Sequence, residues 1–311
     1  MSVTFSGGGV TISGGGWTLQ APPEPNKAIF GYGNNGSTGV SMTNLVSNTG
    51  VVATDTTGVG TARYALAAAG YGTDKAIFGY GQIYAVGPTA ITNKVSNAGV
   101  VATDTTGVGT ARQQLAAAGY GTDKAIFGYG RQPGLDSSIT NLVSNTGVVA
   151  TDTTGVGTAR TILAAAGYGS DKAIFGYGSN DSVSYIAITN LVSNTGVVAT
   201  DTAGVGTARY GLAATGYGTD KAIFGYGFSG SQTSITNLVS NTGVVATDTT
   251  GVGTVRFYLA AAGYGTDKAI FGYGGAPATA VTNLVSNTGV VASNTTGVGT
   301  ARQELAAAAY G

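Results

Sequence analysis

The hydrophobic and polar residues of the chain follow a pattern that recurs six times. Its best preserved part is KAIFGYG, which occupies residues 75–81 in one copy and begins in the others at Lys27, Lys124, Lys172, Lys221 and Lys268. Neighbouring copies begin 47 to 49 residues apart. A period of this length predicts an array of similar structural units rather than one irregular domain.

Each copy contains four short apolar runs separated by turn residues. In the copy that contains Lys75 the tight turn Gly72-Thr73-Asp74 lies between the first two runs, and the runs themselves are residues 66–71, 75–81, 91–96 and 100–105. None of them shows a helical period, and turn residues recur every 8 to 12 positions. The pattern predicts an all-β fold in which each copy is a four-stranded antiparallel meander.

Six such meanders predict a six-bladed β-propeller over residues 27–311, because a lone meander cannot bury both of its faces. The array begins with a second strand and ends with a first strand, residues 305–310. We therefore expect 3+1 closure, in which the C-terminal strand completes the sheet of residues 27–57. Asn26 stands where the other copies have Asp, and Ala309 stands where they have Gly. Both departures fall at the one turn that is cut.

Residues 1–26 lie outside the repeat. Residues 2–6 and 10–13 alternate like strands, and residues 22–25 (PPEP) predict a stiff linker. Candidate anchoring residues are Phe5, Val10, Ile12 and Trp17. The alternative is an unstructured tail. We find no secretory signal and no apolar run long enough to span a bilayer, so we expect no membrane insertion and, outside an assembly, a cytoplasmic protein.

Composition narrows the possible chemistry. Lys plus Arg equals Asp plus Glu at 14 each, which predicts no nucleic-acid partner. Cysteine and histidine are absent, which removes disulfides, imidazole bases and zinc sites of the usual kind, and we expect no metal and no cofactor. The repeated Gly-x-Gly strings lack the Lys-Ser or Lys-Thr of a phosphate-binding loop and do not open a helix, so we interpret them as turns.

The carboxylates give no clear catalytic pair. One set lies eight residues before an Arg in each copy and predicts a clamp to that Arg or to backbone, with a metal ring as the alternative; its members are Asp55, Asp104, Asp152, Asp201, Asp248 and Asn294. The others, Glu24, Asp136, Asp181 and Glu304, are scattered over different copies. Paired acid–base catalysis needs two carboxyls about 5 to 10 Å apart. We therefore predict no catalytic residue and no enzyme, and a glycosidase remains the enzymatic alternative.

Two segments differ between copies, namely the pair after the Arg and the loop between the second and third strands. Alternating strand directions should bring both to one rim, where loops on a rigid frame can form a binding surface. Unconstrained drift of exposed loops is the alternative. The candidate binding face comprises Tyr64, Tyr84, Gln113, Gln114, Arg131, Asp136, Thr161, Tyr185, Tyr210, Phe228, Gln232, Phe257, Tyr258, Gln303 and Glu304.

The repeat resembles the kelch family of β-propellers over residues 27–311, through Arg63, the small strand 66–69, the run AIFGYG and the pair Val100-Val101. It departs from that family in ending the second strand with Gly-Tyr-Gly and in lacking a fourth-strand Trp. The chromosome-condensation-regulator propellers are similar to a lesser degree. Uniform repeats of this type are also similar to those of bacteriophage tail and capsid-associated proteins. The resemblance implies a non-enzymatic virion protein whose partners are other virion proteins or a host-surface glycan or protein. A soluble lectin-like propeller and an engineered or recently amplified repeat are the alternatives.

Overall fold

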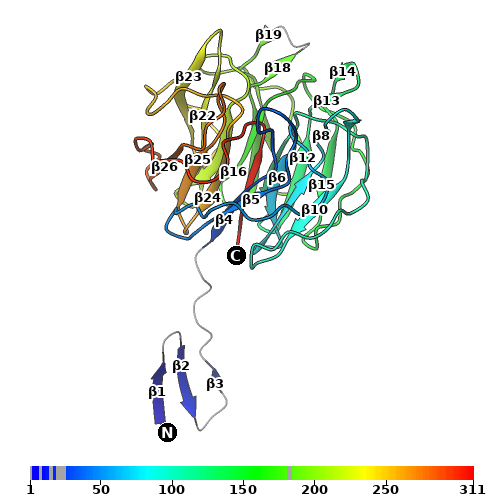
Figure 1. Ribbon diagram of the computed structural model, residues 1–311. Coiled ribbons are helices and arrows are strands. Elements are labelled where there is room, and N and C mark those ends of the chain that lie inside the picture. Colours follow the sequence, from blue (N-terminus) through cyan, green and yellow to red (C-terminus); the bar gives the residue numbers. More distant parts are fainter. Residues whose placement is uncertain (1, 7–8, 14–16, 19–25, 181–183) are drawn as a thin grey trace.

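The computed structural model describes residues 2–6, 9–13, 17–18, 26–180 and 184–311. These residues form antiparallel β-sheets, and none of them belongs to a helix (Figure 1). The described part of the chain accordingly contains no helix that could cross a bilayer. The prediction of an all-β fold is confirmed.

The N-terminal segment forms a three-stranded sheet of its own. Its strands are β1 (Ser2–Ser6), β2 (Gly9–Ser13) and β3 (Trp17–Thr18), in the order β1-β2-β3. Val10 pairs with Phe5, and Ile12 pairs with Trp17. The two predicted strands are confirmed and a short third one is added. The predicted linker at residues 22–25 lies outside the described residues.

Six sheets of three strands account for the repeats. The copy that contains Lys75 forms β6 (Ala67–Tyr71), β7 (Lys75–Gly79) and β10 (Thr92–Val95), with β7 in the centre. The next four copies form the same arrangement with β11 (Ala116–Tyr120), β12 (Lys124–Gly128) and β15 (Thr140–Val143); β16 (Ala164–Tyr168), β17 (Lys172–Gly176) and β20 (Thr189–Val192); β21 (Ala213–Tyr217), β22 (Lys221–Phe228) and β23 (Gln232–Val239); and β24 (Ala260–Tyr264), β25 (Lys268–Gly272) and β26 (Thr282–Val285).

The sixth sheet joins the two ends of the array. The C-terminal strand β27 (Ala306–Tyr310) pairs with β4 (Lys27–Gly31), which pairs with β5 (Thr43–Val46). Tyr310 lies opposite Lys27, in the same register in which Tyr71 lies opposite Lys75. The predicted pairing of the C-terminal strand with the first KAIFGYG strand is therefore confirmed.

The prediction of a regular fourth strand at residues 100–105 is corrected. This segment contacts β10 through two isolated bridges only, Val95 to Val101 and Thr92 to Thr105. The segment has one residue more than β10 between these bridges, so it bulges. The Asn93 amide fills the bulge and donates to the Ala102 carbonyl at 3.0 Å. A side-chain hydrogen bond thus replaces part of the strand ladder, and each sheet has three strands.

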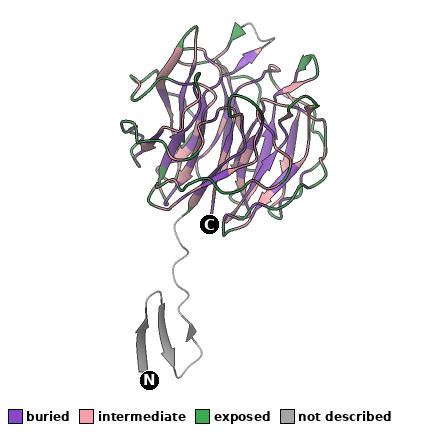
Figure 2. Ribbon diagram, viewed as in Figure 1, coloured by how far each residue is buried: buried purple, intermediate pink, exposed green. Residues whose placement is uncertain are grey.

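The core lies between neighbouring sheets, where buried residues follow the strands in Figure 2. Ile77 packs toward the next copy, whereas Phe78 packs toward the preceding one. The ring of Phe127 lies 5.1 Å from that of Tyr80, centroid to centroid, and a Cβ on Gly79 would come within 2.7 Å of it. KAIFGYG is therefore a strand that packs against a neighbour on both faces and needs Gly79 to admit the next phenylalanine.

The first strands of the six sheets are neighbours in a closed cycle, in the order β6, β11, β16, β21, β24, β27 and again β6. Backbone hydrogen bonds close the same cycle at the tight turns that follow these strands, which we call the turn end. Each turn glycine donates its N–H to the carbonyl of the Asp at the next turn, as Gly72 does to Asp123 at 2.7 Å. At the cut, Gly265 donates to Asn26 at 2.6 Å and Gly311 donates to Asp74 at 2.9 Å.

Candidate binding face

The two variable segments of each copy pair with one another at the opposite end of the strands. Isolated bridges join Tyr64 to Gln82, Gln113 to Arg131 and Tyr210 to Phe228, and the other copies carry equivalent contacts. The loops include the short hairpins β8 (Gln82–Ile83) with β9 (Gly87–Pro88), β13 (Arg131–Gln132) with β14 (Leu135–Asp136), and β18 (Ser179–Asn180) with β19 (Ser184–Tyr185). The prediction that both segments share one rim is confirmed. We call this rim the variable face; it is uppermost in Figure 1.

A ring of six residues lies at the centre of this face, one from each copy at the second position after the Arg. Its members are Ala65, Gln114, Ile162, Gly211, Tyr258 and Glu304, which we call the axial ring. Their backbones form a closed cycle of N–H···O=C bonds of 2.7 to 3.0 Å. All six have positive φ, between 53° and 64°. That conformation costs a residue with a side chain about 1–2 kcal/mol, so the cycle of bonds holds it in place.

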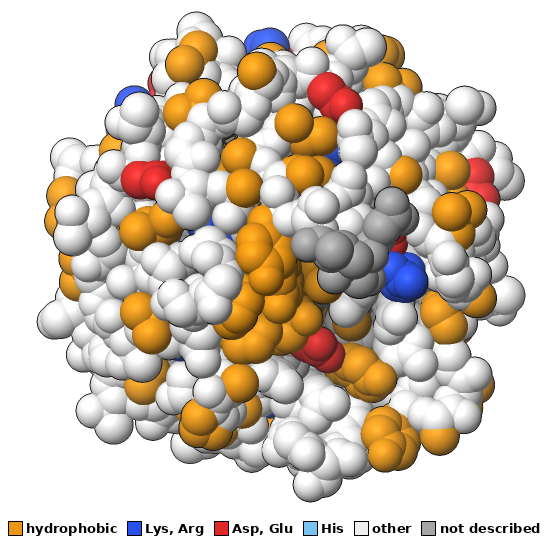
Figure 3. Space-filling view, turned by 90° about the horizontal axis from the view of Figure 1, so that it is seen from above, with side chains coloured by type: hydrophobic (Ala, Val, Ile, Leu, Met, Phe, Trp, Pro, Cys, Tyr) orange, Lys and Arg blue, Asp and Glu red, His pale blue; other side chains and the backbone are white. Residues whose placement is uncertain are grey.

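Five aromatic side chains gather beside the axial ring. They are Tyr185, Tyr210, Phe228, Phe257 and Tyr258, which we call the aromatic cluster. Tyr210 is central, with ring centroids 5.3 Å from Tyr185 and 5.4 Å from Phe228. Figure 3 shows hydrophobic side chains gathered near the centre of this face, with an acidic side chain at the border of the patch. All five residues belong to the binding face predicted from the sequence. Nothing in the sequence indicates that these residues, which come from three different copies, lie together.

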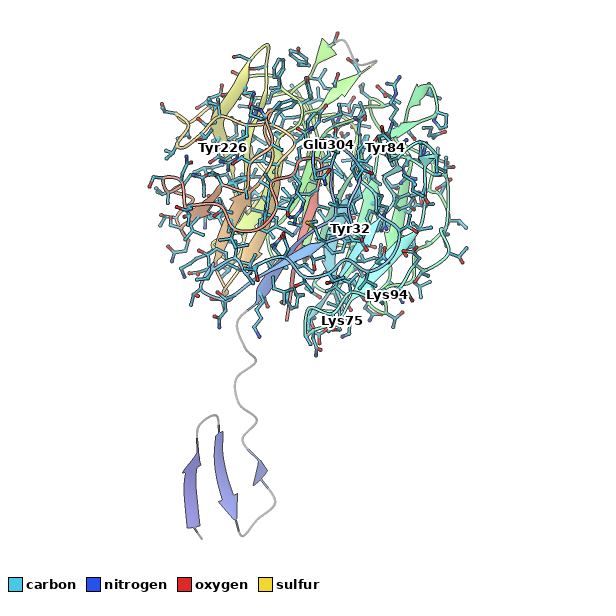
Figure 4. The ribbon with its side chains drawn as sticks, in the orientation of Figure 1. Tyr32, Lys75, Tyr84, Lys94, Tyr226 and Glu304 are labelled. Carbon is cyan, nitrogen blue, oxygen red and sulfur yellow. The ribbon has the colours of Figure 1, made fainter. Side chains whose placement is uncertain are left out.

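Glu304 lies next to this cluster in the axial ring, and Figure 4 shows it toward the variable face. Burial raises the pKa of its carboxyl to about 7. The charge of Glu304 in turn contributes to raising the pKa values of Tyr64 and Tyr258, where burial is the larger cause. The carboxylate therefore lies within electrostatic reach of both phenols.

The remaining candidates have different surroundings. Tyr84 is 56% exposed on its own hairpin. Arg131 forms an ion pair with the buried Asp136 at 3.1 Å, and the Gln232 amide donates to the Ala276 carbonyl. Thr161 is fully buried and donates to the Gln114 amide oxygen at 3.1 Å, so its hydroxyl makes a bond inside the protein and is not exposed on the variable face. Gln113 and Gln303 pair through their backbones with neighbouring loops.

The repeated aspartates form clamps between copies. The Asp152 carboxylate accepts from the N–H and the hydroxyl of Thr110 at 3.1 and 2.6 Å and lies 3.8 Å from Arg112. Burial favours a higher pKa for this carboxyl, but the bonds from Thr110 and Asn141 outweigh it and lower the pKa. The expected clamp to backbone is confirmed, but the nearby Arg precedes Asp152 in the chain, which corrects the expected pairing with Arg160, eight residues later.

The turn end holds a cavity of about 310 Å³, lined by repeated Tyr, Lys and Thr residues. Its lysines have partners, as where Lys124 lies 2.8 Å from Asp123, which also accepts from Asn145 at 3.0 Å. Figure 4 shows the equivalent Lys75 at this end. Among the described residues no three His, Cys, Asp or Glu side chains cluster as a metal site would require. Glu24 and Asp181 lie outside the described residues.

Comparison with known proteins adds no relative: no protein-family model matches the chain, and no curated protein matches it.

Proposed function

We propose that this protein is a non-enzymatic recognition module, a six-bladed β-propeller closed by its C-terminal strand, which binds carbohydrate through the variable face. The cyclic order of the first strands and the two closed cycles of backbone hydrogen bonds support the propeller. A frame closed at both ends keeps the six sheets in register while the loops differ.

The aromatic cluster is the observation that carries the proposed ligand. Four of its rings are only partly buried and Tyr185 is 38% exposed, so each residue of the cluster keeps some surface accessible to solvent. Aromatic rings pack against the apolar faces of sugar rings, and neighbouring amides and phenols bond to sugar hydroxyls. Gln114 and Tyr64 supply such groups close to the axis. Glycan recognition uses this combination of flat apolar surface and fixed polar atoms.

A glycan array with the full chain tests this function. We expect wild-type protein to bind a defined set of glycans and Tyr210→Ala to weaken binding at least ~10-fold, because a central ring of the cluster is worth about 1.5 kcal/mol or more. Tyr84→Ala is the matched control, since it removes an exposed tyrosine of the same face outside the cluster and should change affinity less than about twofold. Absence of glycan binding by the wild-type protein contradicts the proposal.

We further propose that the module belongs to a bacteriophage virion, with the N-terminal sheet as its attachment. The observation that favours this is the place where the chain enters the array. Asn26 bonds to Gly265 at the turn end, so the chain enters on the side opposite the variable face. Attachment there leaves the variable face free. Sedimentation of the native protein tests the proposal, which requires it in particles; a protein found only in the free fraction contradicts it.

A further inference from the structure

Glu304 is an acidic side chain without a cationic partner among the described residues. No hydrogen bond or ion pair to its carboxylate occurs there. The guanidinium nearest in sequence, that of Arg302, is fully buried, donates to Asn44 at 2.6 Å and stacks over Tyr273 at 4.4 Å. Carboxylates elsewhere in the array have partners, as where Asp136 pairs with Arg131 and Asp152 with Thr110. Glu304 is thus the exception among comparable groups.

The surroundings of Glu304 suit a positive charge. Removal from water penalises its charged form, which a bound cation would stabilise. The faces of Tyr and Phe rings carry negative charge density and attract ammonium groups. Tyr258 borders the same cavity as Glu304, and Phe257 and Tyr210 stack beside Tyr258 at 4.4 and 6.1 Å. Carboxylate and aromatic faces together provide two kinds of attraction for one ligand charge.

The size of the cavity limits what can enter it. The volume of this cavity, which we call the axial cavity, is about 80 Å³, and it is lined by the axial ring and by one leucine from each copy, such as Leu66 and Leu305. A water molecule takes about 30 Å³ in the liquid, so the cavity admits a group of a few heavy atoms and no whole sugar ring. A charged substituent of a sugar fits, while the ring itself would remain on the aromatic cluster outside.

We propose that the variable face selects glycans that carry a positively charged amine, which lies in the axial cavity between the Glu304 carboxylate and the Tyr258 ring. The inference rests on the proposed glycan binding and specifies the ligand class of the same site. The amine supplies the missing counter-charge, and the sugar ring to which it is attached contacts the aromatic cluster.

The proposal predicts a pH dependence. The titratable groups that interact with Glu304 are the phenols of Tyr64 and Tyr258, and Tyr84 in turn interacts with Tyr64. The guanidinium of Arg302 stays protonated over this pH range. Burial raises the pKa values of Tyr64 and Tyr258, so both stay neutral at pH 6 to 8. Of these groups only Glu304 changes charge in that interval, because its pKa is raised to about 7. Amine binding should strengthen as the pH rises from 6 to 8, provided that the ligand keeps its charge.

Three chito-oligosaccharide tetramers of equal length, titrated into the full chain by calorimetry, test the proposal. One carries free amines, one is fully N-acetylated, and one is N-trimethylated and stays cationic at every pH. We expect the free-amine tetramer to bind at least ~10-fold more tightly than the acetylated one at pH 7, and the trimethylated one to bind several-fold more tightly at pH 8 than at pH 6.

The decisive variant is Glu304→Gln, because the equivalent ring position already holds a glutamine, Gln114, and the fold accepts it. This variant should reduce the preference for amines to less than about twofold and remove the pH dependence. Equal binding of all three tetramers to the wild-type protein overturns the amine preference and leaves glycan binding standing. An amine preference that survives in Glu304→Gln overturns the role of Glu304. No binding to these tetramers or to any arrayed glycan overturns both proposals.

Discussion

The turn end and the variable face are built on the same kind of frame and differ in what their side chains do. Each is closed by a cycle of six backbone hydrogen bonds, of 2.6 to 2.9 Å at the turn end and 2.7 to 3.0 Å in the axial ring. At the turn end the donors are always glycine and the acceptors are Asp or Asn26. In the axial ring six different residue types occupy the equivalent positions.

The difference shows which contacts require a particular residue. At the turn end the Asp123 side chain accepts from both Lys124 and Asn145, so a change in Asp123 removes the acceptor of both, and a change in either donor removes a partner from Asp123. In the axial ring the backbone alone makes the cycle, and the six residues line a cavity. Uniformity therefore follows side-chain hydrogen bonds, and the backbone cycle leaves the variable face free to diverge.

We expect the largest effect on stability from a substitution at Arg112, the constant residue directly before the variable pair Gln113-Gln114. Its guanidinium is fully buried, donates to the Tyr129 carbonyl at 2.9 Å and the Asn141 amide oxygen at 2.6 Å, and lies near Asp152. Arg112→Ala should lower the free energy of unfolding by about 3–5 kcal/mol, because buried acceptors lose their donor. Urea denaturation measures this loss.

Lys94→Ala is the control for Arg112→Ala. Its ammonium makes one exposed bond, to the Thr146 carbonyl at 3.1 Å, so the change should cost no more than about 0.5 kcal/mol. Equal losses in the two variants would mean that the junction between copies does not depend on the guanidinium.

Substitution of one glycine in each backbone cycle compares the two cycles directly. Gly121 belongs to the turn end and Gly211 to the axial ring, with φ values of 59° and 64°. A Cβ on Gly121 would meet the Asn194 carbonyl oxygen at 2.9 Å, whereas the nearest atoms to one on Gly211 are 3.3 Å away. Gly121→Ala should cost about 2–4 kcal/mol, from the left-handed backbone and the contact with the carbonyl.

Gly211→Ala should cost about 1–2 kcal/mol, the cost of a side chain in this left-handed conformation, which Ala65 already adopts at the equivalent position of the axial ring. Thermal unfolding of both variants measures the difference. If Gly211→Ala is as damaging as Gly121→Ala, the axial ring is not the permissive frame that we infer.

The sequence predicted the parts of the structure that depend on local pattern. Alternation and turn residues located β6, β7 and β10 to within two residues, and the exceptions at Asn26 and Ala309 identified the cut at which β27 joins β4. Comparison of copies placed the variable segments at one end. Each of these predictions uses information carried by neighbouring positions or by the repeat itself.

The remaining features depend on contacts between copies, which local pattern does not encode. The bulge after Val101 arises because the Asn93 amide takes the place of backbone partners, although Asn93 reads as an ordinary strand residue. Asp152 bonds to Thr110, 42 residues earlier, rather than to the Arg that follows it. Glu304 meets Tyr258 only because the ring brings two copies together at the axis.

The smallest of the expected effects concerns the one clamp that lacks a carboxylate. Asn294 accepts from the Thr254 N–H at 3.0 Å, where Asp248 accepts from both the N–H and the hydroxyl of Thr207. Asn294→Asp should raise the free energy of unfolding by about 1 kcal/mol, because a charged acceptor strengthens its hydrogen bonds and Arg256 lies at the same junction.

This gain should depend on pH in one direction. The clamp lowers the pKa of Asp248, so we expect the same for the introduced carboxyl. A lowered pKa gives stability that is present above the unfolded-state pKa, near 4, and is lost as the pH falls through the folded-state value. The Asn294→Asp variant should therefore melt above wild type at pH 7 and together with it at pH 2 to 3. An advantage that persists in acid would mean that shape, not charge, makes the aspartate the better residue in the other five junctions.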